Sequence, residues 1–238
     1  MEKIPPLAAA TAREDVLNVV SHDLRGPLGA IHVALAALAA AEAHPDKQAR
    51  YLRVIRQSTD RAIRTLQELL DVTQMEDHAL VVAPSVVATD LLLARVARDN
   101  EAAAEAYGMT LLVIPPSAPL SVRVDPERMA QALSCLVRHS LQQARGRGPI
   151  ELSATERGAS VVLAVRDHGP GLSEELRASP FHRFWESRPR TGGGALSLAL
   201  ARGIAEAHGG TARADNDPEG GARFEILCPN SIVSSTPA

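Results

Sequence analysis

The sequence predicts an α+β fold with two parts, a helical hairpin followed by an α/β sandwich. Residues 12–75 hold two long segments in which apolar residues recur at helical spacing, separated by a proline-containing break. The later residues alternate short β-branched runs with helical segments, which is typical of a sheet covered by helices. We expect a hairpin over residues 12–78, a linker over 79–86 and a sandwich over 87–230, with disordered segments at 1–11 and 231–238.

The first helix is expected over residues 12–43. Its apolar residues fall on one stripe, because their spacing matches helical turns of about 100° per residue. They are Val16, Val20, Leu24, Ile31, Leu35 and Leu38. His22 lies about 180° from the centre of this stripe, which predicts an imidazole that faces water.

The surroundings of His22 favour a chemical role for it. Asp23 supplies a carboxylate that can accept the imidazole N–H and fix its tautomer. Pro27 removes the backbone donor to the carbonyl of Asp23, and therefore loosens the helix beside His22. We expect a nucleophile, a base or a ligand. The alternative of a solvated histidine without a role stays open.

The second helix is expected to follow a break at His44-Pro45-Asp46, with Asp46 as its cap. Its apolar seam alternates steps of three and four residues, as in a heptad repeat. The seam consists of Leu52, Ile55, Thr59, Ala62, Leu66, Leu69 and Thr73. Since one hairpin cannot cover both seams, we expect a homodimeric four-helix bundle. The alternative is a hairpin packed on its own second domain.

The sandwich is expected to alternate helices and strands. Asp125-Pro126-Glu127 predicts the start of a helix, and Gly209-Gly210 the end of another. Helices are expected at 89–107, 125–143 and 195–208, and strands at 109–114, 120–124, 150–155, 160–166, 211–214 and 222–227, with the pair 150–155 and 160–166 antiparallel.

Composition excludes several classes of function. The formal net charge of -3, with no basic run, argues against a nucleic-acid partner. The apolar patch at residues 7–10 is too short for a secretion signal, and no segment approaches the roughly 20 apolar residues of a membrane span. We therefore expect a cytoplasmic protein without a membrane partner, in which Cys135 and Cys228 are buried and unbridged.

Three motifs together resemble the bacterial two-component sensor histidine kinase family, from about Val16 to Cys228. They are Ser21-His22-Asp23-Leu24-Arg25-Gly26-Pro27-Leu28, Asp167-His168-Gly169-Pro170-Gly171 and Phe181-His182-Arg183-Phe184. The resemblance implies that His22 is phosphorylated and passes the phosphoryl group to an aspartate of a response-regulator receiver domain, with Asp23 as general base. It also implies a homodimer, with ATP and Mg²⁺ as cofactors. Gly26 stands where the family has Thr or Asn to position water for regulator dephosphorylation.

The resemblance also assigns a nucleotide site, in which Asp167 binds the adenine amino group. The residues implied to contact nucleotide are Asp167, Gly169, Gly171, Gly193, Gly194 and His139. A turn at residues 192–194 is one way to hold phosphate in a shifted register, because backbone N–H groups bind anions.

The phosphate side of this site departs from the family. The two asparagines of the family fall on Cys135 and His139, and its lysine falls on Gln142. Neither Cys nor His is a natural ligand for a hard cation that prefers oxygen. Two glycines of the second glycine box are replaced by Ala195 and Ser197. These changes predict weak or lost ATP binding and no metal site in the protein itself.

The sequence thus predicts a signalling protein that carries a phosphoryl group on His22 and exchanges it with a response regulator, with impaired use of ATP. An upstream sensor kinase is a candidate source of the phosphoryl group. Two alternatives stay open: an active ATP-dependent histidine kinase without a sensor domain, and a non-enzymatic module that binds response regulators.

Overall fold

The computed structural model describes residues 6–39, 44–76, 80–144, 146–174, 177, 181 and 195–229. Within these ranges, the side chains of residues 6–20, 22, 23, 74, 76 and 195 are outside the description. The chain divides into two compact units, Met1–Gln74 with Arg183–Leu196 and Met75–His182 with Ser197–Ala238. Residues 6–11, which the sequence predicted to be disordered, are helical, whereas residues 1–5 and 231–238 lie outside the described residues.

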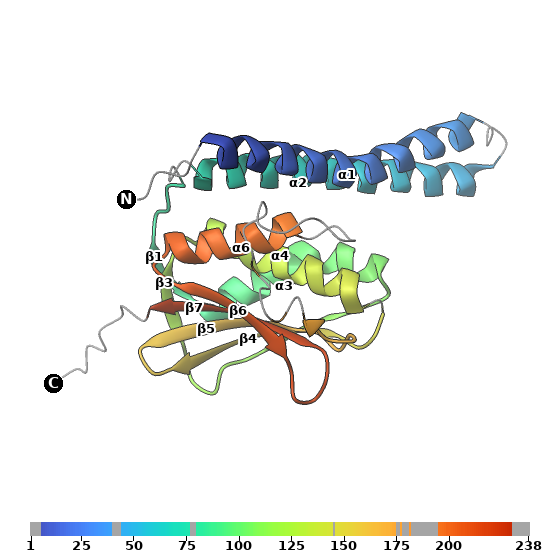
Figure 1. Cartoon of the computed structure of the whole chain (residues 1–238). Helices are drawn as coiled ribbons and strands as arrows, with labels where there is room; N and C mark the ends of the chain where they lie inside the picture. The colour runs from blue at the N-terminus through green and yellow to red at the C-terminus, as the bar shows by residue number, and fades with distance from the viewer. Residues whose placement is uncertain are drawn as a thin grey trace. The chain divides into compact units, whose positions relative to one another are not determined.

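The first unit contains a helical hairpin of α1 (Pro6–Ala39) and α2 (Pro45–Glu76), which lie side by side in Figure 1. α1 begins six residues before the predicted start at residue 12. A proline is well suited to a first helical position, and the Leu-Ala-Ala-Ala run after it has high helix propensity. Pro45 likewise begins α2, so Asp46 lies in the first turn and is not the cap that the sequence predicted.

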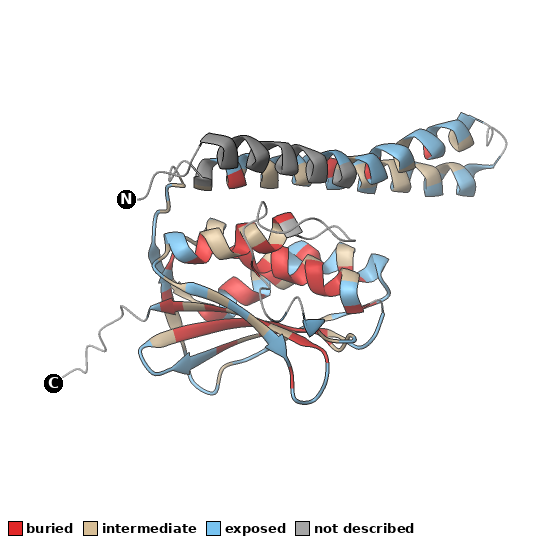
Figure 2. Ribbon diagram, in the orientation of Figure 1, coloured by how far each residue is buried: buried red, intermediate tan, exposed pale blue. Residues whose placement is uncertain are grey.

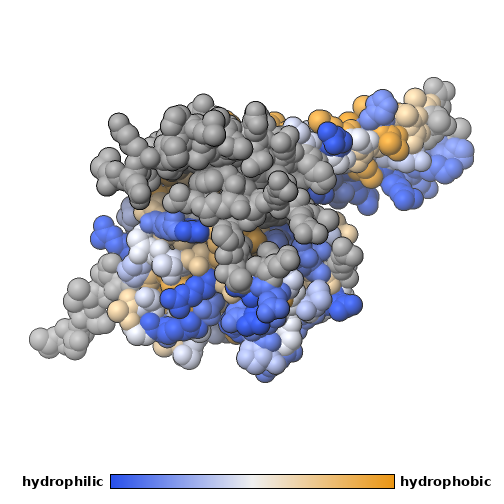
Figure 3. All heavy atoms as spheres, in the orientation of Figure 1, coloured by the Kyte–Doolittle hydropathy of each residue, from blue (hydrophilic) through white to orange (hydrophobic). Residues whose placement is uncertain are grey.

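The centre of the hairpin is built from small residues. Ala34 and Ala62 are 4% and 9% exposed, and Pro27 is buried in α1. Larger apolar residues of the predicted seams remain open in the single chain, since Leu35 is 52% and Leu66 is 45% exposed. Figure 3 shows orange hydrophobic residues among blue ones on the described part of the hairpin. The hairpin therefore leaves apolar surface uncovered.

The second unit is an α/β sandwich, as the sequence predicted. Its sheet has the strand order β2-β4-β5-β7-β6, in which β2 and β4 are parallel and the other neighbours antiparallel. The strands are β2 (Leu111–Ile114), β4 (Ile150–Arg157), β5 (Ser160–Arg166), β6 (Thr211–Asn216) and β7 (Ala222–Pro229). Helices α3 (Thr89–Ala106), α4 (Pro126–Ala144) and α6 (Ala195–Ala207) lie on one face of this sheet (Figure 1).

The core lies between this helical layer and the sheet, where Figure 2 shows the buried residues in red. Leu133, Leu136, Leu163, Ile204 and Ile226 are each 0% exposed and fill this space. Burial of such side chains drives the folding of the sandwich. The two cysteines are buried and unbridged, as predicted.

The second unit contains a strand that the sequence analysis missed. β1 (Ser85–Ala88) pairs antiparallel with β3 (Ser121–Val124), so residues 85 and 86 belong to a strand and not to the predicted linker. The two paired segments are separated by a helix and a strand. A partner so distant in sequence leaves no local signal beyond two valines, because β-propensity depends on the neighbours that a strand finds.

Candidate functional site

Helix α4, which carries part of the candidate site, is fixed at its beginning by Asp125. One carboxylate oxygen of Asp125 accepts the N–H groups of Glu127 and Arg128 at 3.0 and 3.1 Å, and the other accepts Ala83 N–H at 2.9 Å. Asp125 thus caps α4 and confirms the helix start that the sequence predicted here. Partial burial raises the pKa of Asp125, but these N–H groups outweigh it and the pKa is lowered from 3.8.

His208 ties the end of α6 to the beginning of α4. The backbone N–H of Asp125 donates to His208 Nε2 at 2.9 Å, and His208 Nδ1 lies 2.7 Å from the carbonyl of Ile204. Because Nε2 accepts, Nδ1 carries the proton and donates to that carbonyl. The hydrogen bonds of His208 therefore connect α6 with α4, the two helices beside the candidate site.

Asp167 is the centre of the candidate site. It follows β5 directly and is 1% exposed. Its Oδ1 accepts N–H from Gly169 at 2.8 Å and from Ala222 at 3.0 Å, whereas its Oδ2 is buried without a hydrogen-bond partner among the described residues. A buried carboxylate oxygen without a partner costs free energy unless a ligand donates to it. Oδ2 is therefore placed to accept an N–H of a bound molecule.

The turn between β6 and β7 holds the loop that begins at Asp167. Asn216 Oδ1 accepts the N–H of Leu172 at 2.6 Å, and Asn216 Nδ2 donates to Leu172 O at 3.3 Å. At Gly221, which has a φ of 86°, an added Cβ would lie 1.8 Å from the carbonyl oxygen of Asp167. Only glycine allows this approach.

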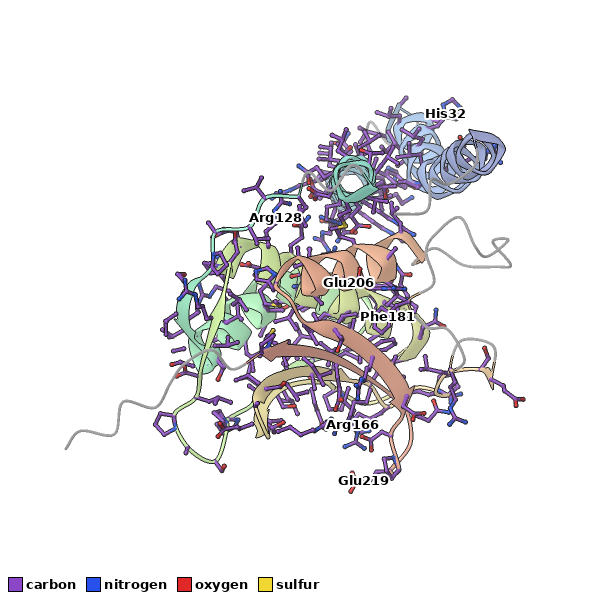
Figure 4. All side chains as sticks on the ribbon, turned by 60° about the vertical axis from the view of Figure 1, so that its left-hand side comes forward. His32, Arg128, Arg166, Phe181, Glu206 and Glu219 are labelled. Atoms are coloured by element: carbon purple, nitrogen blue, oxygen red, sulfur yellow. The ribbon has the colours of Figure 1, made fainter. Side chains whose placement is uncertain are left out.

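A network of charges supports the same loop from the outer face of the sheet. The guanidinium of Arg166 lies 3.2 Å from Asp217, 3.0 Å from Glu219 and 3.6 Å from Glu151. Arg223 contacts the second oxygen of Asp217 at 2.9 Å. Figure 4 shows Arg166 and Glu219 on the side of the sheet opposite α6. Burial raises the pKa of Asp217, but its partners lower it overall from 3.8.

His139 and Cys135 lie one turn apart on α4, and both are buried, at 5% and 0% exposed. Neither ring nitrogen of His139 has a hydrogen-bond partner within the described part of the chain. The ring packs edge-to-face on Phe224 with centroids 5.3 Å apart, and Phe224 packs similarly on Phe181 at 6.4 Å. Burial lowers the pKa of His139 from 6.5 to about 4, so the imidazole is neutral near pH 7.

The described residues of this site differ in the ligand chemistry that they offer. Asp167 Oδ2 presents a buried acceptor, which suits an exocyclic amine. A buried neutral imidazole and a thiol do not suit Mg²⁺, which prefers oxygen ligands in octahedral geometry. No group of three or more His, Cys, Asp or Glu within the described ranges is arranged to hold a metal ion.

The residues that the sequence singled out are distributed unevenly over the structure. Asp167, Gly169 and Gly171 lie in one loop, with Gly171 at a φ of 79°. The backbones of His22 and Asp23 lie in α1, but their side chains are outside the description, as are residues 193 and 194 entirely. Their predicted roles stay predictions.

Sequence reasoning missed the residues of the β6–β7 turn that position this loop. The run Asn216-Asp217-Pro218-Glu219-Gly220-Gly221 carries a strong turn signal. That signal predicted only a connection between two strands. It did not reveal that Asn216 and Ala222 reach back to the loop after β5.

Two family models match the chain, one in each part. Residues 12–78 match the "His Kinase A (phospho-acceptor) domain", and residues 124–232 match "Histidine kinase-, DNA gyrase B-, and HSP90-like ATPase". The first range contains His22 and Asp23, and the second contains His139 and Asp167. The candidate residues thus fall in two known domain types.

Similar proteins are histidine kinases. The sensor-like histidine kinase SenX3 of Mycolicibacterium smegmatis is 27% identical over 226 residues, which cover 92% of this chain and 58% of the relative. The signal transduction histidine-protein kinase AfsQ2 of Streptomyces coelicolor is 38% identical over 110 residues, 45% of this chain and 20% of the relative. The chain thus spans little more than half of the first relative and a fifth of the second.

The fold is also found in a solved structure. The Acinetobacter baumannii histidine kinase AdeS superposes with a TM-score of 0.65 and 18% identity, covering 88% of this chain and 98% of that chain. At this identity the likeness concerns the fold alone. Among the described residues, no helix has the length and apolar character needed to cross a membrane.

Proposed function

Because this chain belongs to the two-component sensor histidine kinase family, we propose that it carries a phosphoryl group on His22 and exchanges it with a response-regulator aspartate, with impaired use of ATP. The observation that carries the second half of this proposal is the burial of Cys135 and His139 on α4. These positions match the two asparagines of the family, and neither side chain replaces an oxygen ligand for Mg²⁺.

The chemistry at His22 requires only the two side chains of its motif. A neutral imidazole, available because the ordinary pKa is about 6.5, attacks the phosphorus of an aspartyl phosphate. The P–O bond to the receiver aspartate breaks and its carboxylate leaves. Asp23 takes the proton from the ring as the N–P bond forms. The receiver supplies its own charge-neutralising groups, so this exchange needs no ATP.

The nucleotide site supports binding of a base more strongly than transfer of phosphate. Asp167 Oδ2 is a buried, unpartnered acceptor among the described residues, and Gly169 and Gly171 shape the loop around it. Phosphoryl transfer from ATP depends on positioning and on neutralising charge. Loss of a metal ligand and of a cation, at His139 and Gln142, is expected to slow it by on the order of 10³-fold or more.

The proposed partners are a receiver domain and a second copy of the chain. The apolar residues left exposed on the hairpin, including Leu35 and Leu66, support pairing of two hairpins. An upstream sensor kinase is the proposed source of the phosphoryl group, because it phosphorylates a receiver that His22 can then discharge.

A second candidate function, an ATP-dependent histidine kinase, is favoured by one observation. Asp167 is buried, and its Oδ2 has no hydrogen-bond partner among the described residues, which supports binding of a base as in an ATP site. A kinase of this kind would phosphorylate His22 without a phosphorylated receiver.

Two labelled donors separate the two candidates. Purified protein is incubated with a phosphorylated receiver domain or with labelled ATP and Mg²⁺, and label on His22 is followed with time. The proposal expects transfer from the receiver within minutes and negligible transfer from ATP. Rapid labelling from ATP would establish the kinase instead, and no labelling from any of a panel of receivers would refute the exchange reaction.

A further inference from the structure

A single carboxylate contacts both neighbours of Asp167. Glu151 Oε1 lies 3.0 Å from His168 Nε2, and Glu151 Oε2 lies 3.6 Å from Arg166 Nη1. Glu151 and Arg166 are also opposite each other in the register of β4 and β5. Because side chains alternate between the two faces of a strand, Arg166 and His168 reach the outer face, while the buried Asp167 between them points inward. The direction of the Asp167 side chain is therefore fixed from both sides.

The imidazole of His168 is also packed against the turn that precedes β4. A Cβ added at Gly148, which has a φ of 68°, would lie 2.9 Å from the Cβ of His168 and 3.0 Å from its Cγ. Only a glycine leaves room for the imidazole here. The side chain of His168 is 30% exposed, so the ring is partly buried between this turn and Glu151. His168 thus has a defined position and not the freedom of a surface side chain.

The charged groups on the outer face around His168 include more carboxylates than cations. They form one network of Glu151, Asp217, Glu219, Arg166 and Arg223. Arg147, in the turn that packs on His168, is exposed to solvent, and Asp167 is buried on the opposite face. Three carboxylates of the network thus face two guanidinium groups. A positive charge on His168 balances the third carboxylate.

Protonation of His168 strengthens its contact with Glu151. The neutral imidazole already donates from Nε2, because a carboxylate only accepts hydrogen bonds. The imidazolium keeps this hydrogen bond and adds the attraction between opposite charges. Histidine is the side chain that gains its charge between about pH 8 and pH 5. The loop that begins at Asp167 is therefore held more firmly as pH falls through this interval.

We propose that His168 and Glu151 are positioning residues of the base site, and that protonation of His168 raises the affinity of this site for adenine. This inference rests on the proposed base-binding role of Asp167, and it adds regulation by pH to that role. A base binds only the arrangement of the loop in which Asp167 Oδ2 faces it. Affinity rises when a larger share of the protein already has the competent arrangement. Both residues act through Asp167.

Calorimetry of the full chain with adenosine, between pH 8 and pH 5.5, tests the inference. Adenosine carries no phosphate, whose ionisation near pH 6 would obscure the profile. The affinity of wild type for adenosine is expected to rise about threefold as pH falls over this range, which is the size expected of a partly exposed ion pair. The buried His139, whose pKa is lowered to about 4, stays neutral throughout.

Two variants of His168 separate its charge from its hydrogen bond. His168→Gln keeps an N–H that can donate to Glu151 but never gains a charge, so its affinity should match that of wild type at pH 8 and stay constant with pH. His168→Leu lacks both and should bind adenosine more weakly at every pH. Arg157→Leu is the matched control, because it breaks an ion pair with Glu225 at the other end of β4. It should keep the wild-type profile.

The outcomes distinguish this inference from the proposal on which it rests. A wild-type affinity for adenosine that is constant from pH 8 to pH 5.5 overturns the role of His168, while the base site stands. A His168→Gln variant that keeps the pH dependence of wild type overturns it as well, because another group must then be its source. Wild-type protein that binds no adenosine at any pH overturns the base site and the inference together.

Discussion

Asn216 and Leu172 are joined by two hydrogen bonds, one in each direction. Leu172 N–H donates to Asn216 Oδ1 at 2.6 Å, and Asn216 Nδ2 donates to Leu172 O at 3.3 Å. The side-chain amide of Asn216 thus pairs with both backbone groups of Leu172, as a neighbouring strand would. These bonds fix the far end of the loop that begins at Asp167. The β6–β7 turn and this loop form one structural unit, although they are distant in sequence.

Replacing Asn216 by Leu is expected to loosen this loop. Both hydrogen bonds are lost, so the free energy of unfolding should fall by on the order of 1–3 kcal/mol, and affinity for adenine nucleotide should fall as well. Asn216→Asp keeps an oxygen that accepts the Leu172 N–H, the shorter of the two bonds at 2.6 Å. This variant should therefore lose less stability and less affinity than Asn216→Leu. Thermal unfolding and calorimetry measure the two effects, with the exposed Arg213→Leu on β6 as control. Equal affinity in all variants would show that the loop holds its shape without Asn216.

Replacing Asp167 by Asn is expected to abolish binding of adenine nucleotide while the fold persists. An asparagine oxygen can still accept the N–H groups of Gly169 and Ala222, but its amide would place a donor where Oδ2 now offers an acceptor. A tenfold or greater loss of affinity is expected by calorimetry. Glu101→Gln, at an exposed position of α3, serves as control. An unchanged affinity would remove Asp167 from the proposed site.

Burial of His139 makes the stability of the sandwich depend on pH. Its pKa is lowered from 6.5 to about 4 in the folded protein, so the unfolded chain binds a proton in this interval and the folded one does not. Stability is therefore expected to fall as pH falls from about 7 toward 4, by on the order of 2–3 kcal/mol.

Chemical unfolding of wild type and His139→Leu across this range isolates the effect. The difference in unfolding free energy between the two proteins should change as pH falls, to the disadvantage of wild type. Only wild type has a buried imidazole that takes up a proton when the chain unfolds. Asp125 and Asp217, whose pKa values are lowered from 3.8, stabilise the fold at neutral pH. This stabilisation is lost as pH falls below about 4, and the loss is equal in both proteins. If the unfolding free energies of the two proteins depended on pH in the same way, burial of His139 would not be the cause of the pH dependence.

Replacing Leu66 by Asp is expected to weaken the proposed dimer. The exposed Leu66 lies on the predicted seam of α2, so an aspartate there would bury an unpaired charge between hairpins. Light scattering over a concentration series should show a shift to monomer. Gln57→Asp adds the same charge away from the seam and should stay dimeric. A wild-type monomer at high micromolar concentration would contradict the interface.

The elements of the sandwich were predictable because their signals are local. Asp125 and the Pro126 after it predict the start of α4, and the β-branched run of β5 predicts a strand that ends before the Asp167 loop. The strand β1 and the role of Asn216 were not predictable, since both depend on partners that are remote in the chain. Burial of His139 also follows from tertiary packing against Phe224, which no spacing in the sequence reveals.

The central claim is that His22 is competent for phosphoryl exchange while the ATP site is impaired by its own substitutions. Labelled ATP with Mg²⁺ tests this on wild type and on a variant that combines Cys135→Asn, His139→Asn and Gln142→Lys. The account predicts negligible label on wild type and measurable label on His22 of the variant, absent when His22 is replaced by Ala. Labelling of wild type within minutes, at a rate that the three substitutions do not increase, would contradict the account.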